Sequence, residues 1–258
     1  MRIRFLAMLS LLALMNMCSK NATSPDQNVA SQLSNTEQMQ IVSAEVAASS
    51  GGIVADLGIM GLIAKGGFST GLYKPASFDT TFKYGWITYS VSLSFYSVLG
   101  NEQPFYIPRL TDKIVYQGTL TGHDSTANRE VDLNKTASFV VTGITTGVIT
   151  INGTASNNSS YEFTGKQVSS EAEVHSTFVV TDVVIDTKVD PFIPQSGKVE
   201  CSFKGSFHRS GPVQDKDVEY DFALTLEFTG NNQVKVTLPN GDQYTLDLMT
   251  GEYTPTKP

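Results

Sequence analysis

The chain has 258 residues, 40% of them hydrophobic, and a formal net charge of −7, which suffices for one large domain with a hydrophobic core. The acidic balance and the scattered Lys and Arg residues argue against nucleic acid as a partner and against docking on an anionic membrane, because both need a concentrated basic surface. Only two cysteines are present, too few for a structural zinc site, and we expect no cofactor.

The first 17 residues have the pattern of a signal peptide. Arg2 and Arg4 form a positively charged start, and residues 5–15 are apolar except for Ser10. This apolar run is shorter than the roughly 20 residues that span a bilayer. The pattern is typical of a cleaved secretory signal, so we expect the protein to be exported.

The end of this segment, Met-Asn-Met-Cys at residues 15–18, resembles the lipidation box of bacterial lipoproteins. In that class the cysteine becomes the lipid-bearing first residue of the mature protein, which implies lipidation of Cys18. Asn16 and Met17 depart from the small residues usual at these positions, so secretion without an anchor is the alternative. Ser19 resembles the outer-membrane sorting pattern, because the retention signal of the class is Asp at that position. The resemblance covers about the first 20 residues only.

Residues 18–35 are predicted to be a flexible tether, because Ser, Asn, Gln and Thr dominate them. Residues 36–66 then place apolar side chains at helical intervals and predict two helices, near 37–48 and near 52–65, separated by Ser-Gly-Gly at 50–52. We expect these helices to pack on the β-domain. A membrane-inserting or lid helix is the alternative, but the polar face of the second helix offers only Lys65 as a cation.

Residues 67–71, GFSTG, match the G-x-S-x-G pattern in which hydrolases place a nucleophilic serine between a strand and a helix. Here a helical segment precedes Ser69 and irregular sequence follows it, so we interpret the match as a chance product of a glycine-rich connection. The three histidines His123, His175 and His208 show no metal-ligand spacing. We therefore predict no catalytic residue and no metal site.

Residues 67–258 are predicted to form a single antiparallel β-domain. The clearest pattern is the stretch of residues 81–98, which predicts one long strand because Ile, Tyr, Val, Leu and Phe alternate with Thr and Ser in its middle, residues 87–95. Further strands follow at the spacing of 8–12 residues that is common in all-β domains. We interpret polar residues 119–128 as a loop and residues 152–160 as the loop of a hairpin. Asp182, in the middle of a long mixed strand, predicts a bulge or a bend.

Two C-terminal patterns make finer predictions. Alternation around Cys201 places this residue on the core face of its strand with Val199 and Phe203, as a buried free thiol. In the last hairpin, only a three-residue loop with Gly241 in the left-handed conformation keeps apolar residues opposite one another. That register pairs Val236 with Tyr244 and Val234 with Leu246.

The predicted fold class is all-β: a mainly antiparallel meander forming an open sheet, a sandwich or a half-barrel, with a short N-terminal helical segment packed on it. We expect a cell-envelope-anchored protein with a binding or structural role, held at the outer membrane by a lipid on Cys18, whose partner is an envelope protein or an apolar ligand. The alternative is a periplasmic or surface carrier of an apolar or lipid ligand, in which the helices close a half-barrel. Periplasmic lipid carriers are similar to this chain only in size and β-richness.

Overall fold

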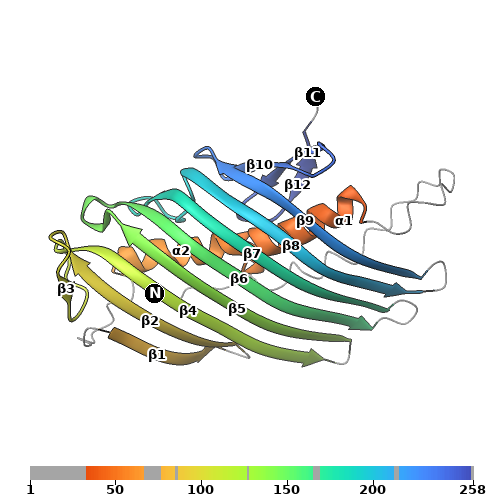
Figure 1. Cartoon of the computed structure of the whole chain (residues 1–258), viewed down its shortest axis with the longest axis horizontal. Helices are drawn as coiled ribbons and strands as arrows, with labels where there is room; N and C mark the ends of the chain where they lie inside the picture. The colour runs from red at the N-terminus through yellow and green to blue at the C-terminus, as the bar shows by residue number, and fades with distance from the viewer. Residues whose placement is uncertain are drawn as a thin grey trace.

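The computed structural model describes residues 33–66, 77–84, 87–126, 128–164, 169–211 and 215–256. Within these residues the chain forms one 12-stranded sheet and two α-helices, and both helices lie on the same side of the sheet (Figure 1). The predicted lipidation site Cys18 and the G-x-S-x-G segment at 67–71 lie outside the described residues.

The helical segment forms as predicted, with bounds shifted by a few residues. Helix α1 covers Asn35–Val46, the 3₁₀ turn η2 covers Ala48–Ser50, and α2 covers Ile53–Ala64. A capping box starts α1: the Ser34 side chain accepts a hydrogen bond from the Glu37 backbone, and the Glu37 side chain accepts one from the Ser34 backbone. Gly51, with φ at 76°, provides the left-handed residue that ends η2. Each α-helix has 12 residues, and no helix in the described ranges has the length and apolarity to cross a bilayer.

The strands follow one another in the sheet in the order in which they occur along the chain, and every pairing is antiparallel. They are β1 (Ser77–Tyr84), β2 (Ile87–Ser97), β3 (Glu102–Gln103), β4 (Thr111–Thr126), β5 (Arg129–Thr142), β6 (Val148–Thr164), β7 (Ser169–Asp186), β8 (Ser196–Ser210), β9 (Lys216–Phe228), β10 (Gln233–Thr237), β11 (Gln243–Asp247) and β12 (Tyr253–Pro255). Strand β3 is a side branch that pairs only with β2, and a second 3₁₀ turn, η3 (Ile144–Thr146), joins β5 to β6. The predicted antiparallel all-β class is confirmed, and of the three proposed arrangements the sheet is open.

One face of the sheet, which we call the core face, is covered by the helices. Helix and sheet side chains belong to a single hydrophobic core. The members with zero exposed surface are Met39, Val42, Val46, Leu57, Phe139, Ile149, Ile151, Val183, Ile185, Val199, Phe203, Leu226, Val236, Leu246 and Leu248. Because a void large enough for water would expose the atoms lining it, these side chains are in direct contact with their neighbours.

Close backbone approaches confirm that the helices are a packed part of the domain. A Cβ atom added to Gly61 of α2 would lie 2.7 Å from the Cβ of Phe192, in the connection between β7 and β8. The backbone N–H groups of Ala48 and Ser49 donate to the carbonyl oxygens of Leu248 and Met249, at 2.9 and 3.0 Å. The helical segment is therefore fixed to the β7–β8 connection and to the residues that follow β11.

Two polar segments that the sequence predicted as loops are strands, so those two predictions were wrong. Strand β4 continues to Thr126, and β6 runs without a break through residues 152–160. Residues 119–122 of β4 pair with both β2 and β5, residues 123–126 pair with β5, and residues 153–160 of β6 pair with both β5 and β7. Hydrogen bonds to neighbouring strands are available to most of this backbone whatever the side chains are, so the sheet context overrides the low strand propensity of these residues.

The Asn152-Gly153 pair, interpreted as part of a turn, lies at an irregularity inside the sheet. The register of β6 against β7 shifts between Ile151 and Gly153. Asn152 Oδ1 accepts a hydrogen bond from the Asp182 backbone at 2.8 Å. Asp182 has a φ of 50°, and the β7–β8 register shifts between Thr181 and Val184. The bulge or bend predicted at Asp182 is thus confirmed as an irregularity of the strand.

Candidate functional site

The face of the sheet opposite the helices carries rows of small hydroxyl side chains. On β5, Lys135, Ala137 and Phe139 point to the core face, so Thr136 and Ser138 point to the opposite, open face. The pairing registers continue the Thr136 row across seven strands. The row consists of Thr81, Ser90, Thr119, Thr136, Ser156, Thr177 and Ser202.

A trough of about 810 Å³ lies on this open face, a volume within the range of natural ligand sites. It crosses β1, β2, β4, β5, β6 and β7 at a constant register, a distance of roughly 24 Å at ordinary strand spacing. Most of its lining comes from the Thr136 row and from the neighbouring row of Ser92, Gln117, Ser138, Thr154 and Val179. Of the described residues, none that lines the trough carries a charge.

The hydroxyl groups of the trough are only partly used within the protein. Thr81 pairs with Ser90 at 3.0 Å, and Thr136 pairs with Ser156 at 2.8 Å. Elsewhere in the lining, the hydroxyls of residues 119, 138 and 154 have no hydrogen-bond partner among the described residues. These groups can donate and accept hydrogen bonds, and each threonine adds a methyl surface beside its hydroxyl.

Ionic side chains lie on the same face outside the trough. Lys198 pairs with Glu200 at 2.9 Å, and Lys204 lies 3.9 Å from Asp221. The charges alternate in sign along β8, whereas Glu219, Asp221 and Glu227 on the same face of β9 are all acidic. The trough is therefore a neutral region in a charged surface, and it favours an uncharged ligand with many hydrogen-bonding groups over an ion.

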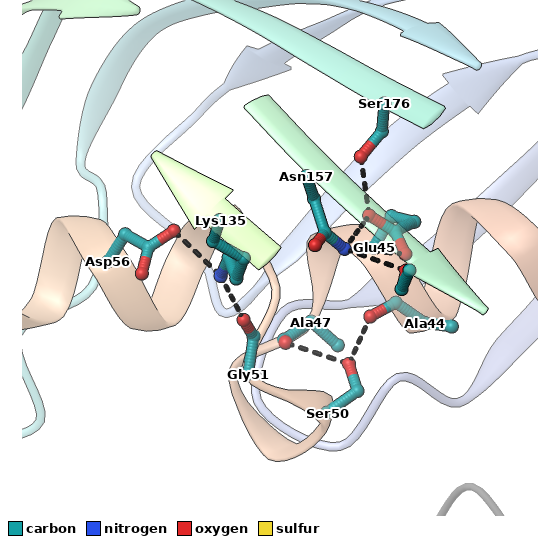
Figure 2. A network of polar contacts seen from close by, with 10 residues as sticks. Ala44, Glu45, Ala47, Ser50, Gly51, Asp56, Lys135, Asn157 and Ser176 are labelled. Atoms are coloured by element: carbon teal, nitrogen blue, oxygen red, sulfur yellow. Dashed lines mark hydrogen bonds and ion pairs between the residues drawn. The ribbon is translucent and has the colours of Figure 1, made fainter. Parts of the chain in front are cut away.

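A second polar site lies under the helices. Lys135 of β5, Asn157 of β6 and Ser176 of β7 are register partners on three adjacent strands. They face Glu45 of α1 and Asp56 of α2 (Figure 2). We call these five residues the polar seam. All of them are buried or nearly so, and they interrupt an otherwise apolar interface.

Glu45 is the centre of one half of the polar seam. Its carboxyl oxygens accept hydrogen bonds from Asn157 Nδ2 at 3.0 and 3.2 Å and from Ser176 Oγ at 2.5 Å. Asn157 Nδ2 also donates to Ser159 Oγ at 3.2 Å, whereas Asn157 Oδ1 is buried without a partner in the described structure. Burial raises the pKa of Glu45, and the hydrogen bonds from Asn157 and Ser176 oppose that shift.

Lys135 is the centre of the other half. Its Nζ atom lies 2.9 Å from Asp56 Oδ2 and donates to the carbonyl oxygen of Gly51 at 2.5 Å. Burial raises the pKa of Asp56, and Lys135 opposes this shift. Burial, with a smaller contribution from the charge of Asp56, raises the pKa of nearby Tyr116 to about 12. Because these groups are shielded from water, the polar seam can hold a proton or fix the helices but cannot receive a substrate in this state.

A third cluster, on the surface, is a weaker candidate for a functional site. His123, Glu130 and Asp132 place potential ligand atoms within 4.8 Å of one another, but all three residues are exposed. His123 Nδ1 lies 2.8 Å from Asp132 Oδ1, and this hydrogen bond raises the pKa of His123. His123 and Asp132 are opposite each other on β4 and β5, and their ion pair is enough to explain why the potential ligand atoms lie close together.

Cys201 is buried and unpaired, with 2% of its surface exposed, as the alternation predicted. The sequence did not single out the polar seam or the trough, because both include residues of the segments interpreted as loops. No family model, curated protein or solved structure matches the chain.

Proposed function

We propose that the protein is an exported binding module, anchored in the cell envelope through a lipid on Cys18, that holds a neutral, hydroxyl-rich chain such as a glycan in the trough. Export and anchoring rest on the N-terminal pattern of Arg2, Arg4, the apolar run and Cys18. Binding rests on the trough itself.

The single observation that carries the binding proposal is the contrast between the two faces of the sheet. The helices cover the core face, while the open face has a long, uncharged depression whose lining includes hydroxyls without protein partners. A site built from hydroxyl, amide and methyl groups matches a ligand that combines hydroxyl groups with C–H surfaces. An extended polymer lying across the strands would meet a repeating set of such groups at about 4.8 Å intervals.

The carrier of an apolar ligand is the second candidate, and the helix packing does not favour it. A movable lid over a lipid cavity requires a space between the helices and the sheet. Met39, Val42 and Leu57, which point from the helices into this interface, have no exposed surface. The helices instead occupy the place that such a ligand would need.

Binding can be tested with the purified full chain on a panel of neutral and acidic polysaccharides. Thr154→Arg puts a long, charged side chain into the trough, and Thr225→Arg makes the same change on the open face outside the trough lining. We expect Thr154→Arg to weaken binding of a neutral polysaccharide at least about tenfold, because the long side chain occupies part of the trough that the ligand would fill. Thr225→Arg should bind like the wild type. Binding that survives Thr154→Arg unchanged, or no binding to any neutral polysaccharide, contradicts the proposal.

A further inference from the structure

The polar seam contains more acidic groups than basic ones. The groups around Glu45 come from five elements. They are Asp56 of α2, Lys135 of β5, Asn157, Ser159 and Tyr161 of β6, Ser176 of β7 and Tyr220 of β9. Lys135 is the one cation in this set, and it faces two carboxyl groups.

Lys135 is already committed to the Asp56 side of the polar seam. It lies 2.9 Å from the Asp56 carboxylate and also donates to the Gly51 carbonyl oxygen. The direct partners of Glu45 are the neutral side chains Asn157 and Ser176. An ionised Glu45, 5% exposed, would therefore be a buried charge without a counterion of its own, a strongly unfavourable state.

A neutral Glu45 fits the surroundings better. A protonated carboxyl group has an O–H donor that a carboxylate lacks. Asn157 Oδ1, on the side chain that contacts Glu45, is a buried acceptor without a donor among the described residues. The proton on Glu45 would remove the uncompensated charge. If the Asn157 amide also turned over, so that Oδ1 in place of Nδ2 faced the carboxyl group, the same proton would give this acceptor a donor.

We propose that Glu45 is a proton-dependent latch: the helices stay docked on the sheet while its carboxyl group is neutral, and ionisation of that group at rising pH releases them. The latch does not depend on what binds in the trough. Its effect is to couple exposure of the apolar core face to the pH of the surroundings.

The direction of the effect follows from the two states of Glu45. Burial raises the pKa of the docked carboxyl group above its ordinary value of 4.5, to which it returns on release. Below that value the group is protonated in both states, and docking has its full strength. As the pH rises from there towards the docked pKa, only the released state ionises, and each pH unit favours release by about tenfold. Burial raises the pKa of Asp56 as well, so Asp56 acts in the same direction.

Cys201 provides a reporter of release. It lies on the core face of β8, two residues from Phe203, which pairs with Ser176 of the polar seam. In a full-length Cys18→Ser variant it is the only thiol, because the chain has two cysteines. The rate of its reaction with an uncharged maleimide, measured from pH 5 to 8.5, reports how often the core face opens.

The decisive measurement compares this protein with the same protein carrying Glu45→Gln, which keeps the shape of the side chain but cannot ionise. Taking the ratio of the two rates at each pH removes the intrinsic pH dependence of the thiol. We expect the rate of the parent divided by the rate of the Glu45→Gln protein to be smallest at pH 5 and to rise from there by up to about tenfold per pH unit. Glu219→Gln, an exposed substitution on β9, should leave the profile of the parent unchanged. A ratio that stays constant with pH overturns the latch.

A second measurement tests the latch without the Glu45→Gln variant, in case that variant does not fold. Carboxyl carbons of glutamate can be followed by NMR in the ¹³C-labelled Cys18→Ser protein across the same pH range. We expect one glutamate to titrate well above 4.5, the ordinary value. If every glutamate titrates at or below that value, Glu45 is ionised in the docked state and the latch is wrong.

Discussion

Lys135 Nζ lies 2.9 Å from Asp56 Oδ2, and the two side chains keep only 11% and 18% of their surface exposed. This ion pair joins the central strand β5 to helix α2. The desolvation of two such charges offsets much of their attraction, so the pair need not add net stability over apolar side chains of the same size. Removing only one partner is expected to destabilise the domain strongly, because the other is then left as a buried, unpaired charge.

Lys135→Met therefore should destabilise the domain strongly. The substitution keeps the length of the side chain but leaves Asp56 and the Gly51 carbonyl oxygen without their donor. We expect a loss of about 3–5 kcal/mol in the free energy of unfolding, measured by urea denaturation at pH 7.

The double variant Lys135→Met, Asp56→Leu is the control for this interpretation. It removes both charges, so most of the lost stability should return if the unpaired carboxylate is the cause. Stability of the single variant equal to that of the wild type would show that Asp56 reaches water, contrary to its burial in the structure.

Helix α2 provides a matched pair of glycines for testing how closely it packs. A Cβ atom at Gly61 would lie 2.7 Å from Phe192 Cβ, whereas at Gly58 the nearest atom, the Phe192 carbonyl oxygen, would be at 3.5 Å. We expect Gly61→Ala to destabilise by about 1–3 kcal/mol through overpacking. Gly58→Ala should be neutral or stabilise by up to about 1 kcal/mol, because alanine is the better helix former. Thermal melts that give the two variants the same stability would contradict the close contact with Phe192.

A substitution at Gly241 in the β10–β11 hairpin measures the energy of backbone conformation without a contribution from side-chain packing. Its register pairs Val236 with Tyr244 and Val234 with Leu246, as the sequence predicted. Gly241 has a φ of 90°, and an added Cβ atom would have no neighbour within 4 Å. Gly241→Ala should therefore cost about 1–2 kcal/mol from backbone strain alone. Gly241→Asn should cost less, since asparagine tolerates this region better. Equal urea midpoints for wild type and Gly241→Ala would show that the loop can rearrange.

The difference between expectation and structure is instructive in β6. The segment NGTASNNSS has the composition of a loop, yet it is the middle of a 17-residue strand. Asn157 and Ser159 occupy core-face positions there, where apolar residues would be expected. Asn157 does so because Glu45, 112 residues earlier in the chain, provides a polar partner, and Ser159 in turn accepts a hydrogen bond from Asn157. Sequence patterns report local alternation, and they cannot show a partner that is supplied by a distant helix.

The helices show the opposite case. Their apolar spacing and the glycines between them predicted both elements and their packing on the sheet, because burial of an apolar stripe is a local signal. The same spacing did not separate Glu45 and Asp56 from ordinary solvent-facing acids. The sequence did not predict the trough either. Alternating Ser and Thr in residues 87–95 predicted a solvent-facing side of that strand, but the depth of the trough depends on how six strands lie together.

The proposed anchor predicts that Cys18 carries the lipid. Cells producing the wild-type chain should incorporate a radiolabelled fatty acid into the protein, and Cys18→Ser should abolish the label, because no other residue of the N-terminal pattern offers a thiol. Cys201→Ser is the matched control: that thiol is buried in the core of the folded domain, so its replacement should leave labelling intact. Equal incorporation in wild type and Cys18→Ser would place the anchor elsewhere or remove it. Loss of label together with release of the protein into the soluble fraction would also show that this single attachment, rather than the domain, holds the protein at the membrane.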